Sequence, residues 1–393
     1  MQLSKRTFLS ALNLIGAFVL GQGSLFLTSS YFLYIHRHDV VSELGLAASL
    51  CSLVVWIADL GGVYILNSHI KGRKKKSVRD FFWMRIGVVS VVVLMGLVLS
   101  VFYRTIELHL PGYVIFLLAI SSCFGFAGLY DGIGKTGHVA LYGSLAWVFS
   151  SALTLLFFDS SKWSIGELVG IGFSAGQWVY SLKTLRLAKA VRAFAWPENC
   201  LCIYSEFKAA VVYVSSYVAG QVYARVLLFG AIGLLDVRSA GYFVYARQIY
   251  NAVSQVVLFV RRSEGVGRAT GTAWEYVLGG RHSLYFSAAL SVVILFLVLL
   301  ANALIELPFM ISVLGVTSAI CLFVWTFLNG FFFYFLAVKK LHLYLMVHGA
   351  GMAAMVTIVS LSTSEIIPFL PGVEAFVLLI EIAFLVLIGR RLV

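Results

Sequence analysis

The chain has 393 residues, of which 61% are hydrophobic and only 12% are charged, and its mean hydropathy is +0.96. Such a composition excludes a soluble globular protein, which needs about twice as many charged residues, and indicates a polytopic membrane protein. The net charge of +12 requires no nucleic-acid partner, because the basic residues fall mostly in short loops, where they set orientation in a membrane.

Twelve apolar stretches are long enough to cross a hydrocarbon core of about 30 Å as helices, which takes roughly 20 residues each. In chain order they are approximately 7–34, 40–69, 81–103, 112–131, 139–158, 164–182, 205–234, 239–260, 283–304, 308–338, 343–361 and 373–389. Membrane-spanning strands would instead show alternating segments of ~10 residues, and the sequence has none. We therefore predict an all-α polytopic membrane protein with about 12 transmembrane helices.

The loops between these stretches differ in their basic residues from one side to the other. Loops on one side hold most of the 29 Lys and Arg, including the run "KGRKKK" at 71–76 and the basic segment at 183–192. Basic loops stay in the cytoplasm, so both termini are predicted to be cytoplasmic. The two basic segments are expected to contact anionic headgroups of membrane lipids.

Two short sequences recur in the two halves of the chain. "VLGQ" at 19–22 is followed by "DVVSELG" at 39–45, and "VAGQ" at 218–221 is followed by "DVRSAG" at 236–241. Each pair lies late in one predicted helix and at the start of the returning one. The halves are therefore interpreted as two copies of one six-helix unit, related by a parallel repeat.

This repeat predicts the domain organisation. We expect an N-terminal lobe at 1–182 with helices 1–6, a cytoplasmic basic linker at 183–204, and a C-terminal lobe at 205–393 with helices 7–12. In folds of this kind the substrate binds between the repeats, which rock against each other. A central cavity is therefore predicted.

Four motifs resemble a known family. They are the turn "DVVSELG", the "ADLGGVYIL" of the second span, the "RDFFWMR" after the basic loop, and the "DVRSAGYFVYARQI" that opens the second half. Together they resemble the Wzx-type polysaccharide (O-antigen/exopolysaccharide) flippases of the multidrug/oligosaccharidyl-lipid/polysaccharide (MOP) exporter superfamily. The resemblance implies a MATE/MOP-like fold in the bacterial inner membrane, and a role in surface polysaccharide or lipopolysaccharide biosynthesis.

The cargo and the partners are likewise implied by the resemblance. The cargo is an undecaprenyl-diphosphate-linked oligosaccharide repeat unit, moved from the cytoplasmic to the periplasmic leaflet by alternating access. The implied partners are this lipid-linked glycan, membrane lipids and other polysaccharide assembly proteins.

Four basic residues fall inside the apolar stretches, where a charge is costly and marks a functional site by default. Arg85 and Lys208 lie near cytoplasmic helix ends and are expected to snorkel to the interface. They are secondary candidates for cargo binding.

Arg225 and Arg247 each lie eleven residues from Asp236, about 16 Å at 1.5 Å per residue, which is close to the bilayer midplane. Guanidinium groups bind phosphate in a bidentate manner, so these two arginines are predicted to hold the diphosphate. The alternative is that they pair with acids and lock helices together.

Asp59 and Glu381 are acids near mid-depth in their spans. Each is interpreted either as the partner of an arginine or as a site that takes up a coupling ion, H⁺ or Na⁺. Gln22 and Gln221 end the repeated "GQ" motifs, and their amides are expected either to face the sugar in the cavity or to bond between helices.

No nucleotide, metal or other cofactor is expected. "GIGKTG" at 132–137 contains G-x-G-x-x-G, but a phosphate loop would need a glycine where Leu129 stands and a preceding strand. Five cysteines lack the spacing of a metal site; they are residues 51, 123, 200, 202 and 321.

Two rival functions come from other classes. A cation-coupled drug or metabolite antiporter of the same superfamily would want acids to dominate the lumen, whereas two arginines stand against two acids here. A membrane-embedded glycan polymerase or glycosyltransferase would need a large periplasmic loop, and outer loops such as "HRHD" and "DSSKWS" are short. The sequence therefore favours a transporter that is not an enzyme.

Overall fold

The computed structural model is helical through nearly all of the residues that it describes, and no strand occurs among them. These residues are 5–62, 65–66, 75–102, 110–133, 136–160, 162–197, 203–204, 206–208, 210–211, 225–263, 273–279, 281–305, 309–338 and 340–390.

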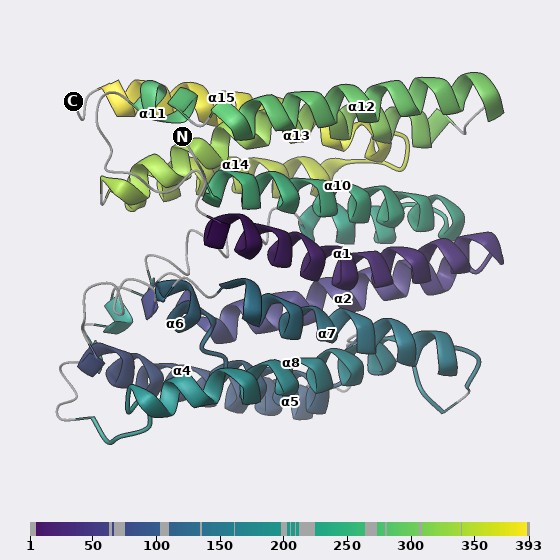
Figure 1. The fold of residues 1–393 in the computed structure, drawn as a ribbon. Helices are drawn as coiled ribbons and strands as arrows, with labels where there is room; N and C mark the ends of the chain where they lie inside the picture. The colour runs from purple at the N-terminus through teal and green to yellow at the C-terminus, as the bar shows by residue number, and fades with distance from the viewer. Residues whose placement is uncertain are drawn as a thin grey trace. The chain divides into compact units, whose positions relative to one another are not determined.

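The chain forms two compact units. The first consists of Met1–Ile35 and Glu43–Val218, and the second of His36–Ser42 and Ala219–Val393. Figure 1 shows both units as bundles of long helices. The predicted boundaries at 182 and 204 stay a prediction, although the helix that contains residue 182 continues to Ala190.

The helices of the first unit are α1 (Lys5–Tyr34), α2 (His38–Asp59, whose first turn groups with the second unit), α4 (Lys75–Phe102), α5 (Gly112–Cys123), α6 (Ala127–Gly132), α7 (Thr136–Phe157) and α8 (Ile165–Ala190). The second unit contains a helix at Arg225–Leu234, α10 (Val237–Ser263), α11 (Ala273–Gly279), α12 (Arg281–Ile305), α13 (Phe309–Ala337), α14 (Leu341–Leu361), the 3₁₀ turn η1 (Ile367–Phe369) and α15 (Leu370–Arg390).

Eight of the helices in the described residues are long and apolar enough to cross a membrane. They are Asn13–Tyr34, His38–Asp59, Gly112–Tyr130, Ala140–Phe157, Ser283–Leu300, Ile311–Phe335, Leu341–Leu361 and Ile367–Gly389. Each of the twelve predicted stretches overlaps a described helix. The predicted fold class, an all-α polytopic membrane protein, is confirmed.

Small residues set the packing of the first unit, where α7 lies along both α1 and α8 (Figure 1). A Cβ added at Gly172 of α8 would lie 2.6 Å from the backbone of Ser150 in α7. The Ser150 hydroxyl donates to the Val169 carbonyl of α8 at 2.9 Å. Close backbone approach at a G-x-x-x-G motif, here Gly172 and Gly176, is a typical way for helices to associate in lipid.

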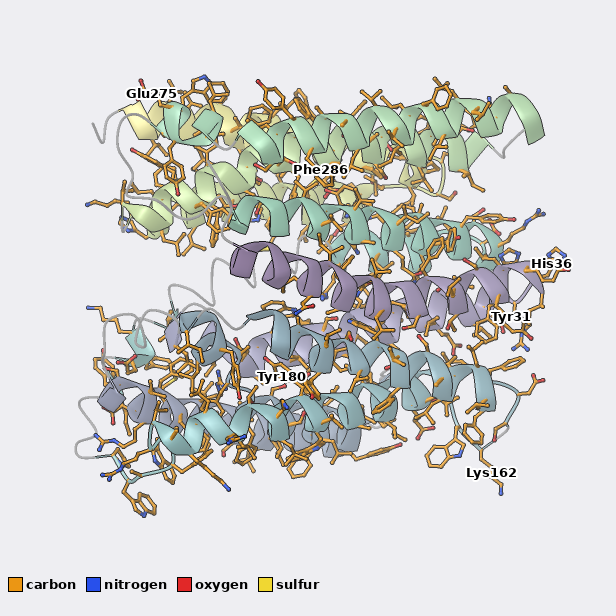
Figure 2. The ribbon with its side chains drawn as sticks, in the orientation of Figure 1. Tyr31, His36, Lys162, Tyr180, Glu275 and Phe286 are labelled. Carbon is orange, nitrogen blue, oxygen red and sulfur yellow. The ribbon has the colours of Figure 1, made fainter. Side chains whose placement is uncertain are left out.

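In the second unit α13 is the central helix and packs against α10, α11, α12, α14 and α15. The faces that α13 does not cover are apolar. On α12, for example, Val292, Phe296 and Leu299 are each more than 60% exposed, and apolar side chains cover its outer surface in Figure 2. Such a surface is what a helix facing lipid needs.

Candidate functional site

The first unit contains two helix ends that lie close together inside the bundle. Helix α2 ends at Asp59, and the chain then turns through Leu60 and Gly61, which have φ of 51° and 71°. Helix α5 ends at Cys123, and α6 begins four residues later at Ala127, although 112–130 is one candidate span. The last carbonyls of a helix lack partners within the helix, so both ends need hydrogen-bond donors.

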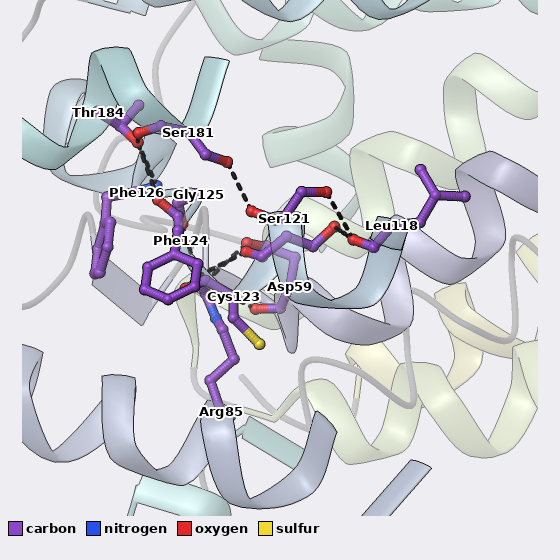
Figure 3. A network of polar contacts seen from close by, with 11 residues as sticks. Asp59, Arg85, Leu118, Ser121, Cys123, Phe124, Gly125, Phe126, Ser181 and Thr184 are labelled. Atoms are coloured by element: carbon purple, nitrogen blue, oxygen red, sulfur yellow. Dashed lines mark hydrogen bonds and ion pairs between the residues drawn. The ribbon is translucent and has the colours of Figure 1, made fainter. Parts of the chain in front are cut away.

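Arg85 of α4 supplies donors to both helix ends (Figure 3). Its Nη1 donates to the carbonyls of Ser122, Cys123 and Gly125 at 3.3, 3.2 and 2.6 Å. Its Nη2 donates to the Asp59 carbonyl at 3.1 Å and to Asp59 Oδ1 at 2.9 Å. One guanidinium thus bridges the negative ends of two helices, where a cation is favoured by the helix dipoles.

Helix α8 completes this network, which we call the Arg85 network. Ser181 donates its hydroxyl to the Ser121 carbonyl at 2.7 Å. The Thr184 hydroxyl donates to the Phe124 carbonyl at 3.2 Å and accepts from the Phe126 amide at 3.1 Å. The interruption between α5 and α6 is therefore satisfied by neighbouring side chains, as irregular backbone inside a membrane must be.

The expectation that Arg85 snorkels is wrong, because its side chain is 0% exposed. Its guanidinium carbon lies 4.9 Å from the centre of the Phe81 ring and 5.9 Å from that of Phe126. A Cβ at Gly62 would overlap Nη2 of Arg85, so the turn after α2 leaves room for the guanidinium only because residue 62 is glycine.

The second unit holds a buried ion pair between α10 and α15. Arg247 Nη1 lies 2.8 Å from Glu374 Oε2, and Nη2 lies 3.4 Å from Oε1. Both side chains are only 4% exposed. The Arg247 guanidinium carbon also lies 4.7 Å from the centre of the Tyr250 ring, one turn further along α10. The carboxylate thus occupies the edge of the guanidinium that a phosphate group would use.

A second buried pair links α14 to α15. His348 Nδ1 lies 2.8 Å from Glu381 Oε2, and the side chains are 6% and 3% exposed. Within the described part of the chain, Glu381 Oε1 has no hydrogen-bond partner. A Cβ at Gly351 would overlap this oxygen. Glu374 and Glu381 are seven residues apart on α15, which is two helical turns or about 10.5 Å.

The other predicted site residues differ in how far they are buried. Arg225 is 7% exposed in the helix that precedes α10, Gln22 is half-buried in α1, and Lys208 is exposed. Gln221 lies outside the described residues. The structure brings Asp59 to Arg85 and Glu381 to His348; Arg247 is held by Glu374.

Glu374 and His348 were not singled out in the sequence. The signal for Glu374 is its spacing from Glu381, since residues seven apart on a helix share a face. The signal for His348 is an imidazole within the apolar run "LYLMVHGAGMAAM". Among the residues that the structure describes, no group of three or more His, Cys, Asp or Glu side chains is placed to hold a metal ion.

Solved structures of similar fold cover nearly the whole chain. The eukaryotic MATE transporter AtDTX14 is 11% identical and aligns over 97% of this chain and 96% of its own, with a TM-score of 0.60. The MATE transporter ClbM, solved with Rb⁺, is 14% identical over 99% and 94%, with a TM-score of 0.58. The lipid II flippase MurJ, in an inward closed conformation, is 15% identical over 98% and 87%, with a TM-score of 0.53.

No family model matches the chain, and no curated protein matches its sequence. The similarity to solved structures is thus one of fold. The chain has the fold of the MATE/MOP transporters, as the resemblance of its motifs implied.

Proposed function

We propose that this protein is a flippase that moves undecaprenyl-diphosphate-linked oligosaccharide across a bacterial inner membrane by alternating access. The fold supports this proposal, because it is shared by a protein named as a lipid II flippase. The buried cations support an anionic cargo: Arg225 and Arg247 are 7% and 3% exposed and lie at equal sequence distances from Asp236, in consecutive helices.

Arg247 pairs with an acid, Glu374, as the alternative interpretation of the sequence expects, and the observation that carries the proposal is the geometry of this pair. Both oxygens of the carboxylate face the guanidinium fork, which is the geometry by which arginine also binds a phosphate group. A phosphate group that replaced the Glu374 carboxylate would leave Arg247 with an anionic partner. Loss of one partner from a buried ion pair costs about 3–5 kcal/mol, and exchange of one anion for another avoids this cost because Arg247 stays paired.

The pair His348–Glu381 is proposed as the coupling site, with H⁺ as the ion. The His348 ring and the Glu381 carboxylate lie 2.8 Å apart, which is close enough for a proton to pass from one to the other. The unpartnered Glu381 oxygen offers a second position for the proton. Because Glu381 and Glu374 lie on one face of α15, a change in the charge of the first acts on the second across about 10.5 Å.

A second candidate is a drug or metabolite antiporter, which the similarity to MATE transporters favours. The two functions require cargo of different charge. An antiporter for cations would bind its cargo at Glu374 or Glu381, whereas the flippase uses Arg225 and Arg247. Replacement of Arg225 or Arg247 should therefore abolish transport by a flippase and should not abolish transport by an antiporter for cations.

The test is replacement of each arginine in a polysaccharide-producing bacterium whose own flippase is deleted. We expect Arg225→Gln and Arg247→Gln to abolish surface polysaccharide and to accumulate lipid-linked oligosaccharide in the inner leaflet, at normal protein levels. Arg247→Lys is expected to rescue only partly, because an ammonium group keeps the charge but loses the fork. Arg238→Gln is the matched control, since Arg238 is exposed at the start of α10.

A purely structural role of the ion pair predicts a different pattern. If Arg247 only locks α10 to α15, the double variant Arg247→Gln/Glu374→Gln would restore export, because it leaves no unpaired buried charge. Export that survives either single Gln substitution would also reject the proposal. Loss of cationic drug efflux with intact polysaccharide would favour the antiporter.

A further inference from the structure

A cavity of about 690 Å³ lies in the first unit, where α6, α7 and α8 meet. Its volume is in the range of ligand sites, which is roughly 300–1,000 Å³. The side chains around it come mainly from α8 and are of two kinds, basic and apolar or aromatic. They include Tyr130, Tyr142, Leu182, Lys183, Arg186 and Leu187.

The two charged side chains among the described residues that line this cavity are both basic. Lys183 and Arg186 are both exposed, lie three residues apart on α8 and thus share a face. Lys183 Nζ lies 4.7 Å from the centre of the Tyr142 ring, so a cation–π contact holds the ammonium against the wall. The Tyr130 hydroxyl donates to the Lys183 carbonyl at 3.2 Å, which ties α6 to α8 beside the cations.

The rest of the cavity wall is apolar and accessible. Leu182 is 61% exposed and Ile133 is 43% exposed, and both line the cavity. A free anion would gain nothing from these side chains, whereas a molecule with an anionic head and a hydrocarbon part would contact both kinds of wall. Among the described residues that line the cavity, none is acidic and two are basic, which favours an anionic ligand over a cationic one.

The position of the cavity along the helices matches the edge of a membrane. Tyr142 lies two residues inside the candidate span that begins at Ala140, and Tyr130 is the last residue of the span from Gly112. Tyrosine is enriched at membrane–water interfaces, where its ring is apolar and its hydroxyl is hydrated. The basic residues therefore stand at the level where lipid phosphates lie.

From these observations we propose that the cavity between α6, α7 and α8 binds an anionic phospholipid. Lys183 and Arg186 hold the phosphate of its headgroup, and Leu182 and Leu187 contact its glycerol and the first carbons of its acyl chains. This binding does not depend on the cargo, because none of the residues involved takes part in the Arg247 or His348 pairs.

The test is native mass spectrometry of the purified full chain, titrated with phosphatidylglycerol or with phosphatidylcholine. We expect the wild type to retain phosphatidylglycerol selectively, and Lys183→Gln/Arg186→Gln to reduce the bound fraction about tenfold. The matched control is Lys189→Gln/Arg192→Gln, which removes the same charge from exposed residues that do not line the cavity. Lys183→Arg/Arg186→Lys is expected to bind like the wild type and checks that the site tolerates substitution.

Two further measurements separate a lipid from a free phosphate. Leu182→Gln is expected to weaken phosphatidylglycerol binding severalfold, and millimolar inorganic phosphate is expected to leave bound lipid in place. Displacement of the lipid by phosphate, together with no effect of Leu182→Gln, would overturn the proposal in favour of a simple anion site. Equal losses in the two double Gln variants would overturn it in favour of unspecific attraction to basic residues.

Discussion

Arg85 and Asp59 form an ion pair at the point where α2 ends, with Nη2 of the arginine 2.9 Å from the carboxylate and 3.1 Å from the backbone carbonyl of the same residue. This pair explains why the run "VVWIADLGG" contains an acid. The carboxylate balances a guanidinium whose other terminal nitrogen, Nη1, donates to three carbonyls around the end of α5. The charge of Asp59 thus helps Arg85 to hold the end of α2 against the end of α5.

The first prediction concerns the relative importance of the two partners. Arg85→Gln is expected to destabilise the protein by about 3–5 kcal/mol, because it removes a buried cation that donates to Asp59 Oδ1 and to four backbone carbonyls. Asp59→Asn keeps an acceptor oxygen for Arg85 and is expected to cost less, about 1–3 kcal/mol. The measurement is thermal unfolding of the purified protein in detergent.

Lys208→Gln is the control for this comparison, because Lys208 is exposed and its loss should leave the unfolding temperature unchanged. An Arg85→Gln protein as stable as the wild type would show that the network contributes nothing to stability. A larger effect of Asp59→Asn than of Arg85→Gln would place the main role on the acid instead.

The second prediction uses two glycines that lie two residues apart on α14. A Cβ at position 351 would overlap the Glu381 carboxylate, whereas nothing lies within 4 Å of a Cβ at position 349. Gly351→Ala is therefore expected to push Glu381 away from His348 and to lower export severalfold. Gly349→Ala should export normally, and equal export by the two variants would contradict the described position of Glu381.

The third prediction concerns the contact between α7 and α8. A Cβ at Gly176 would overlap the backbone of Ala146, and the helices cannot separate without losing the bond between Ser150 and the Val169 carbonyl. Gly176→Ala is expected to cost about 1–3 kcal/mol, as overpacking of a close contact does. Gly87→Ala in α4 is the control, since nothing lies within 4 Å of its added Cβ. Unfolding temperatures of the two variants decide the matter.

The fold could be predicted because each helix carries its own hydrophobic signal. Twelve apolar stretches each overlap a helix, and the stretches 7–34 and 308–338 lie within two residues of α1 and α13 at both ends. The helix ends agree less well, because helices continue past the hydrocarbon core. Helix α8 runs to Ala190, eight residues beyond the predicted end of its span.

This error in helix ends also explains what was missed at the candidate sites. Arg85 was assigned to a helix end because the span was predicted to begin at residue 81, whereas α4 begins at Lys75 and so buries Arg85 almost three turns in. Glu374 stands near the predicted start of its span, but α15 begins at Leu370. The partner of His348 lies 33 residues away in sequence, and no local pattern could identify it.

The last prediction tests proton coupling at the pair formed by His348 and Glu381. In proteoliposomes containing lipid-linked oligosaccharide, cargo movement by the wild type is expected to change several-fold with the pH gradient. Glu381→Gln and His348→Gln are expected to remove this dependence, because neither leaves a pair that exchanges a proton at 2.8 Å. Glu365→Gln removes the same charge from an exposed residue and should respond to the gradient like the wild type.

Cargo movement by Glu381→Gln that still depends on the pH gradient would place the coupling proton at another residue. A wild type that responds to a Na⁺ gradient and ignores pH would reject H⁺ as the coupling ion.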